Sequence, residues 1–207
     1  MDKTNKMLTF EHQLWAEGFS RVMGLDEVGR GCLAGPVVAA GVILRPNTTI
    51  EGVKDSKKLS VSERLRLSQL IMEKAAYWTI QVGDIALIDK INILWASLET
   101  MHTCALQDEA KPDYLLIDGN RFVTTLLPHR CIVKGDDNSL SIAAASILAK
   151  VYRDQIMCEL HDYYPEFGWS KNVGYPTKEH KDALLNLGYT VHHRKSFNLS
   201  TDKPYSK

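Results

Sequence analysis

Hydrophobic residues recur along the first 82 residues in patterns that predict two strands, a helix and a third strand. Residues 21–28 and the almost continuously apolar run 36–44 are expected to pair as a hairpin across a glycine-rich turn. Ser60 and Glu63 form a capping-box sequence that opens a helix. Its apolar face is expected to comprise Leu67, Leu70, Ile71 and Ala75. The chain then returns as a predicted strand over residues 77–82.

From residue 84 onward, helices and short strands alternate. A helix starting at Asp84 has apolar residues at helical spacing that we expect in the core: Ile88, Ile91, Trp95, Leu98 and Met101. Strands are predicted at 114–117 and 130–134, followed by a long helix over 139–164. A last helix is expected between a cap at Thr177 and a stop at Gly188, with one apolar face of Ala183, Leu184 and Leu187.

This order of elements predicts an α/β fold in which a mixed sheet is flanked by helices and a helical lobe lies at the C-terminus. Three parts are expected along the chain. Residues 1–17 form a helical N-terminal extension of open role, residues 18–160 form the core, and residues 161–207 form the C-terminal lobe with a polar tail.

Composition limits the functions to consider. The 207 residues carry 25 Lys and Arg against 25 Asp and Glu, so any attraction to nucleic acid must be local rather than a property of the total charge. Four cysteines without C-x-x-C spacing are typical of reduced thiols rather than a disulfide framework or a zinc site. No membrane-length apolar run or secretory signal is found, so we expect a cytoplasmic protein.

Carboxylates mark the candidate chemistry. Asp26 and Glu27 interrupt an apolar strand, where neighbouring side chains point to opposite faces, so at least one should lie near the core. Asp118 and Asp136 follow two short strands, and ligands collect beyond the carboxyl ends of strands in α/β sheets. Oxygen ligands without nearby His or Cys suit Mg²⁺ or Mn²⁺, which indicates a nuclease or phosphotransferase. Alternatively, these residues are turn formers, or Asp26 and Glu27 pair with Arg30.

Two further segments suit phosphate binding. Gly29-Arg30-Gly31 follows the acidic pair and could bring backbone groups and a guanidinium close to a ligand, although a simple hairpin turn has the same composition. Lys54, Lys57 and Lys58 give one loop a local positive charge. The C-terminal lobe is mildly basic, with Trp169 and Tyr175 available for stacking on sugars or bases.

Several blocks of the chain resemble bacterial ribonuclease HII, the type 2 ribonuclease H. They occur in that family's order between about residue 20 and residue 197. The blocks are Gly24-Leu-Asp-Glu-Val-Gly-Arg-Gly31, Asp55-Ser-Lys-Lys-Leu59, Ile117-Asp-Gly119, Lys134-Gly-Asp136, Ser141-Ile-Ala-Ala-Ala-Ser-Ile-Leu-Ala-Lys150, Arg153-Asp154, and Gly174-Tyr-Pro-Thr177 with His180.

The resemblance implies a ribonuclease H-like fold and an endonuclease dependent on Mn²⁺ or Mg²⁺. Such an enzyme cuts the RNA strand of RNA/DNA hybrids, and cuts 5′ of single ribonucleotides in duplex DNA, leaving 5′-phosphates. It serves ribonucleotide excision and RNA primer removal in DNA repair and replication. By motif position, the implied catalytic and metal-binding residues are Asp26, Glu27, Asp118 and Asp136.

The resemblance also implies a substrate-binding set. Gly29, Arg30 and Gly31 would sense the ribose 2′-OH, Tyr175 would stack on the adjoining deoxyribose, and Lys57 would touch backbone phosphate. The family pattern favours Asp136 over its neighbour Asp137 as the ligand. A monomer is implied, and the tail from Ser200 to Lys207 shows no motif for docking on a sliding clamp.

Two rival hypotheses concern the same residues. In one, the chain is a non-catalytic module that binds hybrids, and its carboxylates are only structural. In the other, it is a metal-dependent phosphotransferase that acts on DNA recombination intermediates, since a fold does not fix a substrate. Tight hybrid binding unaffected by EDTA would favour the first, and activity on all-DNA junctions alone would favour the second.

Overall fold

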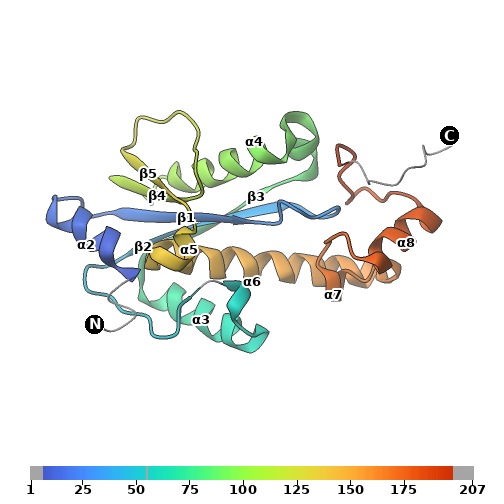
Figure 1. Ribbon diagram of the computed structural model, residues 1–207, viewed down its shortest axis with the longest axis horizontal. Helices are drawn as coiled ribbons and strands as arrows, with labels where there is room; N and C mark the ends of the chain where they lie inside the picture. The colour runs from blue at the N-terminus through green and yellow to red at the C-terminus, as the bar shows by residue number, and fades with distance from the viewer. Residues whose placement is uncertain (1–6, 55, 198–207) are drawn as a thin grey trace.

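A computed structural model describes residues 7–54 and 56–197 (Figure 1). Its centre is a five-stranded sheet in the order β3-β2-β1-β4-β5. The strands are β1 (Val22–Val28), β2 (Val37–Leu44), β3 (Ala75–Gly83), β4 (Tyr114–Asp118) and β5 (His129–Ile132). β2 pairs antiparallel with β1 and β3, whereas β4 pairs parallel with β1 and β5. The predicted hairpin and mixed sheet are therefore confirmed, and β1 is the central strand.

Helices cover both faces of the sheet (Figure 1). α4 (Ile85–Ala105) lies on one face, where it packs mainly on β2 and β3, and its second half shares a core cluster with residues of β1, β2 and β4. α3 (Val61–Lys74) and the long α6 (Leu140–Tyr163) lie on the other, and the small residues of α6 pack against β2. Because alanines and serines fill the first turns of α6, its backbone comes so close to β1 that a Cβ at Gly24 would collide with the main chain of Ser141.

The predicted helix starts are confirmed by their caps. Ser60 and Glu63 form the complete capping box of α3, and the side chains of Asp84, Ser139 and Thr177 each accept a hydrogen bond from the third residue of their helix. Each cap satisfies a backbone N–H that the helix itself leaves without a partner. The expected helix end was wrong at Ala75, which begins β3.

α4 contains a break that the hydrophobic pattern missed. Asn92 has φ 64° and ψ 164°, and its side-chain oxygen accepts hydrogen bonds from the backbone N–H groups of Leu94 and Trp95. The helix therefore restarts after Asn92 with a different rotation. As a consequence, Trp95 is 48% exposed, and the prediction that it lies in the core was wrong. Leu98 and Met101 are buried as predicted.

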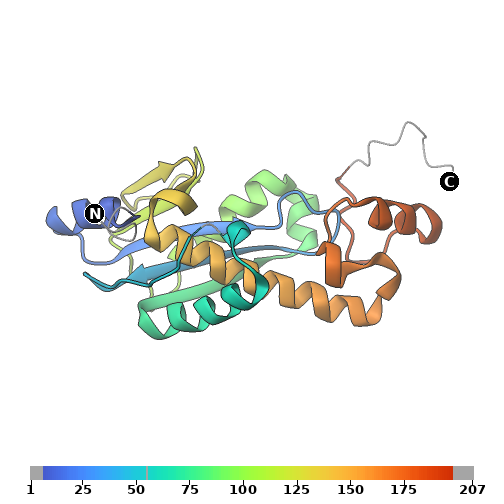
Figure 2. The same ribbon diagram turned by 60° about the horizontal axis from the view of Figure 1, so that its bottom comes forward.

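The C-terminal lobe packs on the far end of α6 (Figure 2). It consists of a short turn at Pro165–Phe167, α7 (Trp169–Asn172) and α8 (Lys178–Leu187). Trp169 and Leu184 are buried there, but Leu187 is 60% exposed, so the predicted apolar face of α8 was too wide. The remaining helices are α2 (Thr9–Ala16), α5 (Gly135–Asn138) and a turn at Ser56–Lys58.

Two sequence expectations concern the outer parts of the chain. The helical N-terminal extension is represented by α2, and the division at residues 17 and 160 stays a prediction. The tail from Ser200 to Lys207 lies outside the described residues. Within the described ranges, no helix combines the length and the apolar character needed to cross a membrane.

Candidate metal and nucleic-acid site

The central strand places the first two carboxylates. Asp26 is buried and Glu27 is partly buried, as expected for a carboxylate pair in a strand between two others. Burial raises the pKa of the Asp26 carboxyl well above its usual range, and the negative charges of Glu27 and Asp118 raise it further. The backbone N–H of Glu27 donates to Asp26 Oδ1 at 2.7 Å. An ionised Asp26 therefore lacks the positive charge that would offset its burial.

Asp118 and Asp136 are brought together by the ends of β4 and β5. Asp118 is the last residue of β4, and the backbone N–H of Gly135 donates to its Oδ1 at 2.7 Å. Asp136 follows in α5 and is buried, with its Oδ2 3.7 Å from Lys57 Nζ. Asp137, by contrast, is exposed and pairs with Lys58 at 2.6 Å. This difference in burial favours Asp136 as the functional carboxylate.

Asp26, Glu27 and Asp118 lie close enough for their charges to interact, and Asp136 directly follows Gly135, whose N–H binds Asp118. We call these four carboxylates the acidic site. No group of three or more His, Cys, Asp and Glu side chains in the described ranges is placed to share one ion. Glu27 turns to Arg30, 3.1 Å away, as the ion-pair interpretation of the sequence expected. The oxygen-only donors and the shifted pKa of Asp26 nevertheless fit a hard divalent cation.

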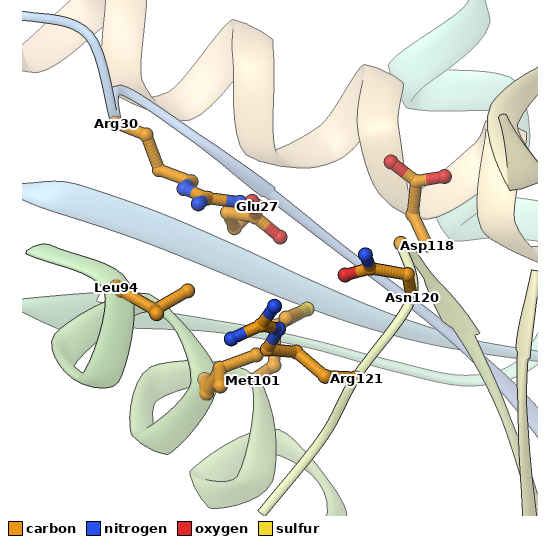
Figure 3. Close-up of a pocket in the computed structure, with 9 residues that line it drawn as sticks. Glu27, Arg30, Leu94, Met101, Asp118, Asn120 and Arg121 are labelled. Atoms are coloured by element: carbon orange, nitrogen blue, oxygen red, sulfur yellow. Dashed lines mark hydrogen bonds and ion pairs between the residues drawn. The ribbon is translucent and has the colours of Figure 1, made fainter. Parts of the chain in front are cut away.

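A pocket of about 200 Å³ opens beside the acidic site (Figure 3). Glu27 and Asp118 line it together with Arg30, Asn120 and Arg121. Its floor comes from α4, through Leu94, Leu98 and Met101. Asn120 and Arg121 were not singled out from the sequence, although their position just beyond Asp118 at the carboxyl end of β4 was a usable signal. Arg30 and Arg121 give this pocket two guanidinium groups that suit phosphate oxygens.

The Gly-Arg-Gly turn lies against the C-terminal lobe. Gly29 has φ +100°, and a Cβ there would collide with the guanidinium of Arg153. A Cβ added to Gly31 would lie 3.7 Å from the ring of Tyr175, which is 39% exposed. The structure thus brings Gly31 and Tyr175 to the same surface, as the resemblance implied, although they are far apart in sequence.

Two arginines without exposed surface hold this surface together, and we call them the arginine bridge. Arg153 donates to the backbone carbonyls of Ala34, Pro36 and Val173 at 2.8–3.0 Å. Arg194 donates to the carbonyls of Arg30, Gly35 and Pro36 at 2.9–3.2 Å, and burial lowers its pKa to about 10. The bridge therefore ties the segment after Gly31 to the segment before Tyr175.

A buried histidine pair holds Tyr175 from the other side. Trp169 Nε1 donates to His180 Nε2 at 3.1 Å, which leaves His180 Nδ1 to donate to the Tyr175 carbonyl at 3.0 Å. His193 Nδ1 accepts from Thr190, so its Nε2 donates to His180. Burial lowers the pKa of His193 to about 4 and also lowers that of His180. Both rings are neutral positioning groups near pH 7.

Other predicted residues have mixed outcomes. Lys57 has an exposed side chain beside Asp136, so the side chain is accessible to a phosphate, and its phosphate contact stays a prediction.

All four cysteines are free. Cys32 and Cys104 are buried, and burial raises the pKa of both thiols, as expected for inert residues. Cys158 is exposed.

Comparisons with known proteins show which family and which fold the chain shares. A family model described as Ribonuclease HII matches residues 23–200. Ribonuclease HII of Salinibacter ruber is 50% identical over 200 residues, which are 95% of this chain and 100% of the relative. In the structure of the PCNA:RNase HII complex from Archaeoglobus fulgidus, a chain 25% identical superposes with a TM-score of 0.72, covering 88% of this chain and 98% of the other. Bst-RNase HIII in complex with Mn²⁺ shares the fold, with 21% identity, a TM-score of 0.56, and coverage of 84% and 66%.

Proposed function

Since the chain belongs to the ribonuclease HII family, we propose that it cuts the RNA strand of RNA/DNA hybrids and nicks 5′ of single ribonucleotides embedded in duplex DNA. Family membership makes it a type 2 ribonuclease H nuclease. The observation that carries the finer proposal is the buried Asp26. Its pKa is raised by burial and by the charges of Glu27 and Asp118, next to a surface where Gly31 meets Tyr175.

The proposed cofactor is Mn²⁺ or Mg²⁺, held by Asp26, Glu27, Asp118 and Asp136. Bst-RNase HIII, which shares the fold, is known in complex with Mn²⁺. The bound ions would activate a water and stabilise the leaving oxygen of the phosphodiester, so that a 5′-phosphate is produced. Glu27 contacts Arg30 through Oε1, so its Oε2 could act as a ligand, and a phosphate arriving at Arg30 would compete with Glu27 for the guanidinium.

Substrate selection is proposed to come from the surface between the two lobes. The backbone of Gly29, Arg30 and Gly31 can approach the 2′-OH, which is the group that distinguishes RNA from DNA. The ring of Tyr175 would stack on the deoxyribose that follows, while Lys57 and Arg121 would contact backbone phosphates. An RNA-to-DNA junction would then be recognised by two segments that the arginine bridge keeps at a fixed separation.

The testing experiment is a nicking assay on four substrates. They are a duplex with one ribonucleotide, an RNA/DNA hybrid, the matching all-DNA duplex and an all-DNA four-way junction, each with Mn²⁺, with Mg²⁺ and with EDTA. The proposal expects metal-dependent cutting of the first two, with incision 5′ of the single ribonucleotide. Hybrid binding without cleavage would instead support the non-catalytic module, and cutting of the junction alone would support the phosphotransferase.

The cellular setting follows from the same proposal. The enzyme would serve ribonucleotide excision and RNA primer removal during DNA repair and replication, working as a monomer in the cytoplasm. The four free cysteines support a reducing compartment. Sedimentation of the purified protein with and without duplex tests the monomeric state.

A further inference from the structure

Helix α2 reaches the start of α6 through one buried side chain. Glu11 is 1% exposed, and its Oε1 accepts hydrogen bonds from Ser139 Oγ at 2.6 Å, Ser141 Oγ at 2.7 Å and the backbone N–H of Ser141 at 3.0 Å. These donors form the first turn of α6, where backbone N–H groups lack helical partners and the helix dipole favours a negative charge. Glu11 therefore anchors the start of α6 from outside the helix.

The same turn is connected to two of the candidate metal ligands. The backbone N–H of Ser139 donates to the Gly135 carbonyl at 2.8 Å, and the Gly135 N–H donates to Asp118 Oδ1 at 2.7 Å. Asp136 directly follows Gly135 in the chain. A continuous path of short hydrogen bonds thus runs from Glu11 through Ser139 and Gly135 to Asp118, with Asp136 on the same short helix.

The central strand meets this path as well. A Cβ on Gly24 would collide with the main chain of Ser141, so β1 rests directly on the turn that Glu11 anchors. Asp26 lies two residues further along β1. A shift of the first turn of α6 would consequently displace β1, which carries Asp26 and Glu27, and α5, which carries Asp136.

Stability alone does not account for Glu11. Its second oxygen, Oε2, is buried without a hydrogen-bond partner, which costs free energy in a folded protein. In addition, α2 lies outside residues 23–200, the range matched by the family model.

We propose that Glu11 is a positioning residue, through which α2 fixes Asp118 and Asp136 in the arrangement that binds a divalent cation. The inference rests on the proposed metal-dependent function. Glu11 touches neither the metal nor the substrate in this proposal. It acts only by holding Ser139, Ser141 and the short helix that precedes them, so its effect should be seen in metal binding rather than in binding of the duplex.

The test compares Glu11→Ala with a matched control, Asp113→Ala. Asp113 accepts hydrogen bonds from the backbone N–H groups of Ser20 and Arg21 at 2.7–3.0 Å and from Ser20 Oγ at 3.1 Å. Asp113 thus anchors a segment in a similar way. It lies just before the start of β4, at the opposite end of that strand from Asp118. Mn²⁺ binding is measured by electron paramagnetic resonance titration, thermal stability by melting without metal, and KM by cleavage of the single-ribonucleotide duplex.

Glu11→Ala is expected to weaken Mn²⁺ binding by about tenfold, in the range known for residues that orient metal ligands, with KM for the duplex changed by less than about twofold. Asp113→Ala should lower the melting temperature without weakening Mn²⁺ binding. Glu11→Gln keeps an oxygen for the serine donors but places an NH₂ group where Oε2 has no partner, so it should weaken Mn²⁺ binding by about threefold.

Three results would overturn the inference. The first is a Glu11→Ala variant that binds Mn²⁺ as tightly as the wild type. The second, if the alanine variant does not fold, is the same result for Glu11→Gln. The third is an Asp113→Ala variant that loses as much Mn²⁺ affinity as Glu11→Ala. If the wild-type protein cuts the duplex with Mn²⁺ and the Glu11 variants bind Mn²⁺ as tightly as it does, the positioning role alone is refuted. A wild-type protein that neither binds Mn²⁺ nor cuts refutes the proposed function, and the positioning role with it.

Discussion

The acidic site and the arginine bridge both bury charged groups, and they differ in how those charges are satisfied. Arg153 and Arg194 donate six hydrogen bonds to five backbone carbonyls, and the Pro36 carbonyl accepts from both. Asp26 instead faces two further carboxylates, and both burial and those charges disfavour its ionised form. Buried polar groups whose hydrogen bonds are all made within the chain rigidify a structure, whereas buried like charges close together raise its free energy. The arginine bridge therefore stabilises the surface between Gly31 and Tyr175, whereas the charges of the acidic site suit the binding of a cation.

The largest effect should come from removing one charge of the acidic site. Asp118→Asn is expected to lower cleavage by at least about a hundredfold, because an amide is a much poorer ligand for a hard divalent cation. The amide oxygen can still accept from the Gly135 N–H, so hybrid binding in EDTA should stay within about twofold. Single-turnover cleavage and fluorescence anisotropy measure the two quantities. Asp108→Asn, an exposed carboxylate elsewhere, is the control, and equal cleavage by Asp118→Asn would contradict the assignment.

Damage to the arginine bridge should appear first as lost stability. Arg153→Lys cannot reach all three carbonyls, and each buried polar group left unpaired costs about 1–3 kcal/mol, so a loss of about 2–4 kcal/mol is expected in urea denaturation. Where the variant is still folded, KM for the single-ribonucleotide duplex should rise because Gly31 and Tyr175 lose their fixed separation. Arg21→Lys is the control, since Arg21 also donates to loop carbonyls. Equal stability of the Arg153 variant and wild type would refute the bridge.

The unsatisfied charge of Asp26 should make its removal stabilising. Because the folded-state pKa of Asp26 lies above its ordinary value, ionisation at neutral pH opposes folding, and Asp26→Asn should gain about 1–2 kcal/mol without metal at pH 7 while losing cleavage. The gain should disappear below about pH 4, where the wild-type carboxyl is protonated in both states. Thermal melts at the two pH values measure it, and a lower melting temperature for the variant at pH 7 would contradict this account.

The smallest expected effect concerns the histidine pair beside Tyr175. The folded-state pKa of His193, about 4, lies below its ordinary 6.5, so the unfolded chain binds more protons between these values and stability falls as the pH drops through that window. From pH 7.5 to pH 6 the loss should be roughly 0.5–1 kcal/mol. Melts followed by tryptophan fluorescence test it, with His193→Gln expected to flatten the slope and His129→Gln to leave it unchanged. An unaltered slope in His193→Gln would remove this explanation.

Much of the fold was predictable because its signals are local. Capping residues such as Ser60 and Thr177 determine where helices start, and the apolar runs of β1 and β2 give a hairpin. The break at Asn92 was not predictable from hydrophobic spacing, because a helix that restarts out of phase has the same composition as a continuous one. Trp95 was misplaced in the core for this reason.

The residues of the candidate site also differ in whether a local sequence pattern identifies them. Asp26, Glu27, Asp118 and Asp136 could be chosen because each follows or interrupts an apolar strand, which is a local pattern. The roles of Arg153, Arg194 and Glu11 depend on contacts between distant segments, and their sequence neighbourhoods gave no such indication. Arg121 was missed although its position beyond Asp118 was informative, since an exposed arginine in a loop is common.

The break in α4 also has a consequence for what the helix connects. Before Asn92, Asp89 accepts hydrogen bonds from the backbone N–H groups of Lys195 and Ser196. These hydrogen bonds attach the first half of the helix to the C-terminal segment. After Asn92, Leu94 and Met101 form the pocket floor. Because the helix restarts at Asn92, its two halves present different faces to the rest of the molecule. One helix thus links the C-terminal segment to the pocket, and Ile88 and Ala96 join its two halves in a single core cluster with Val37.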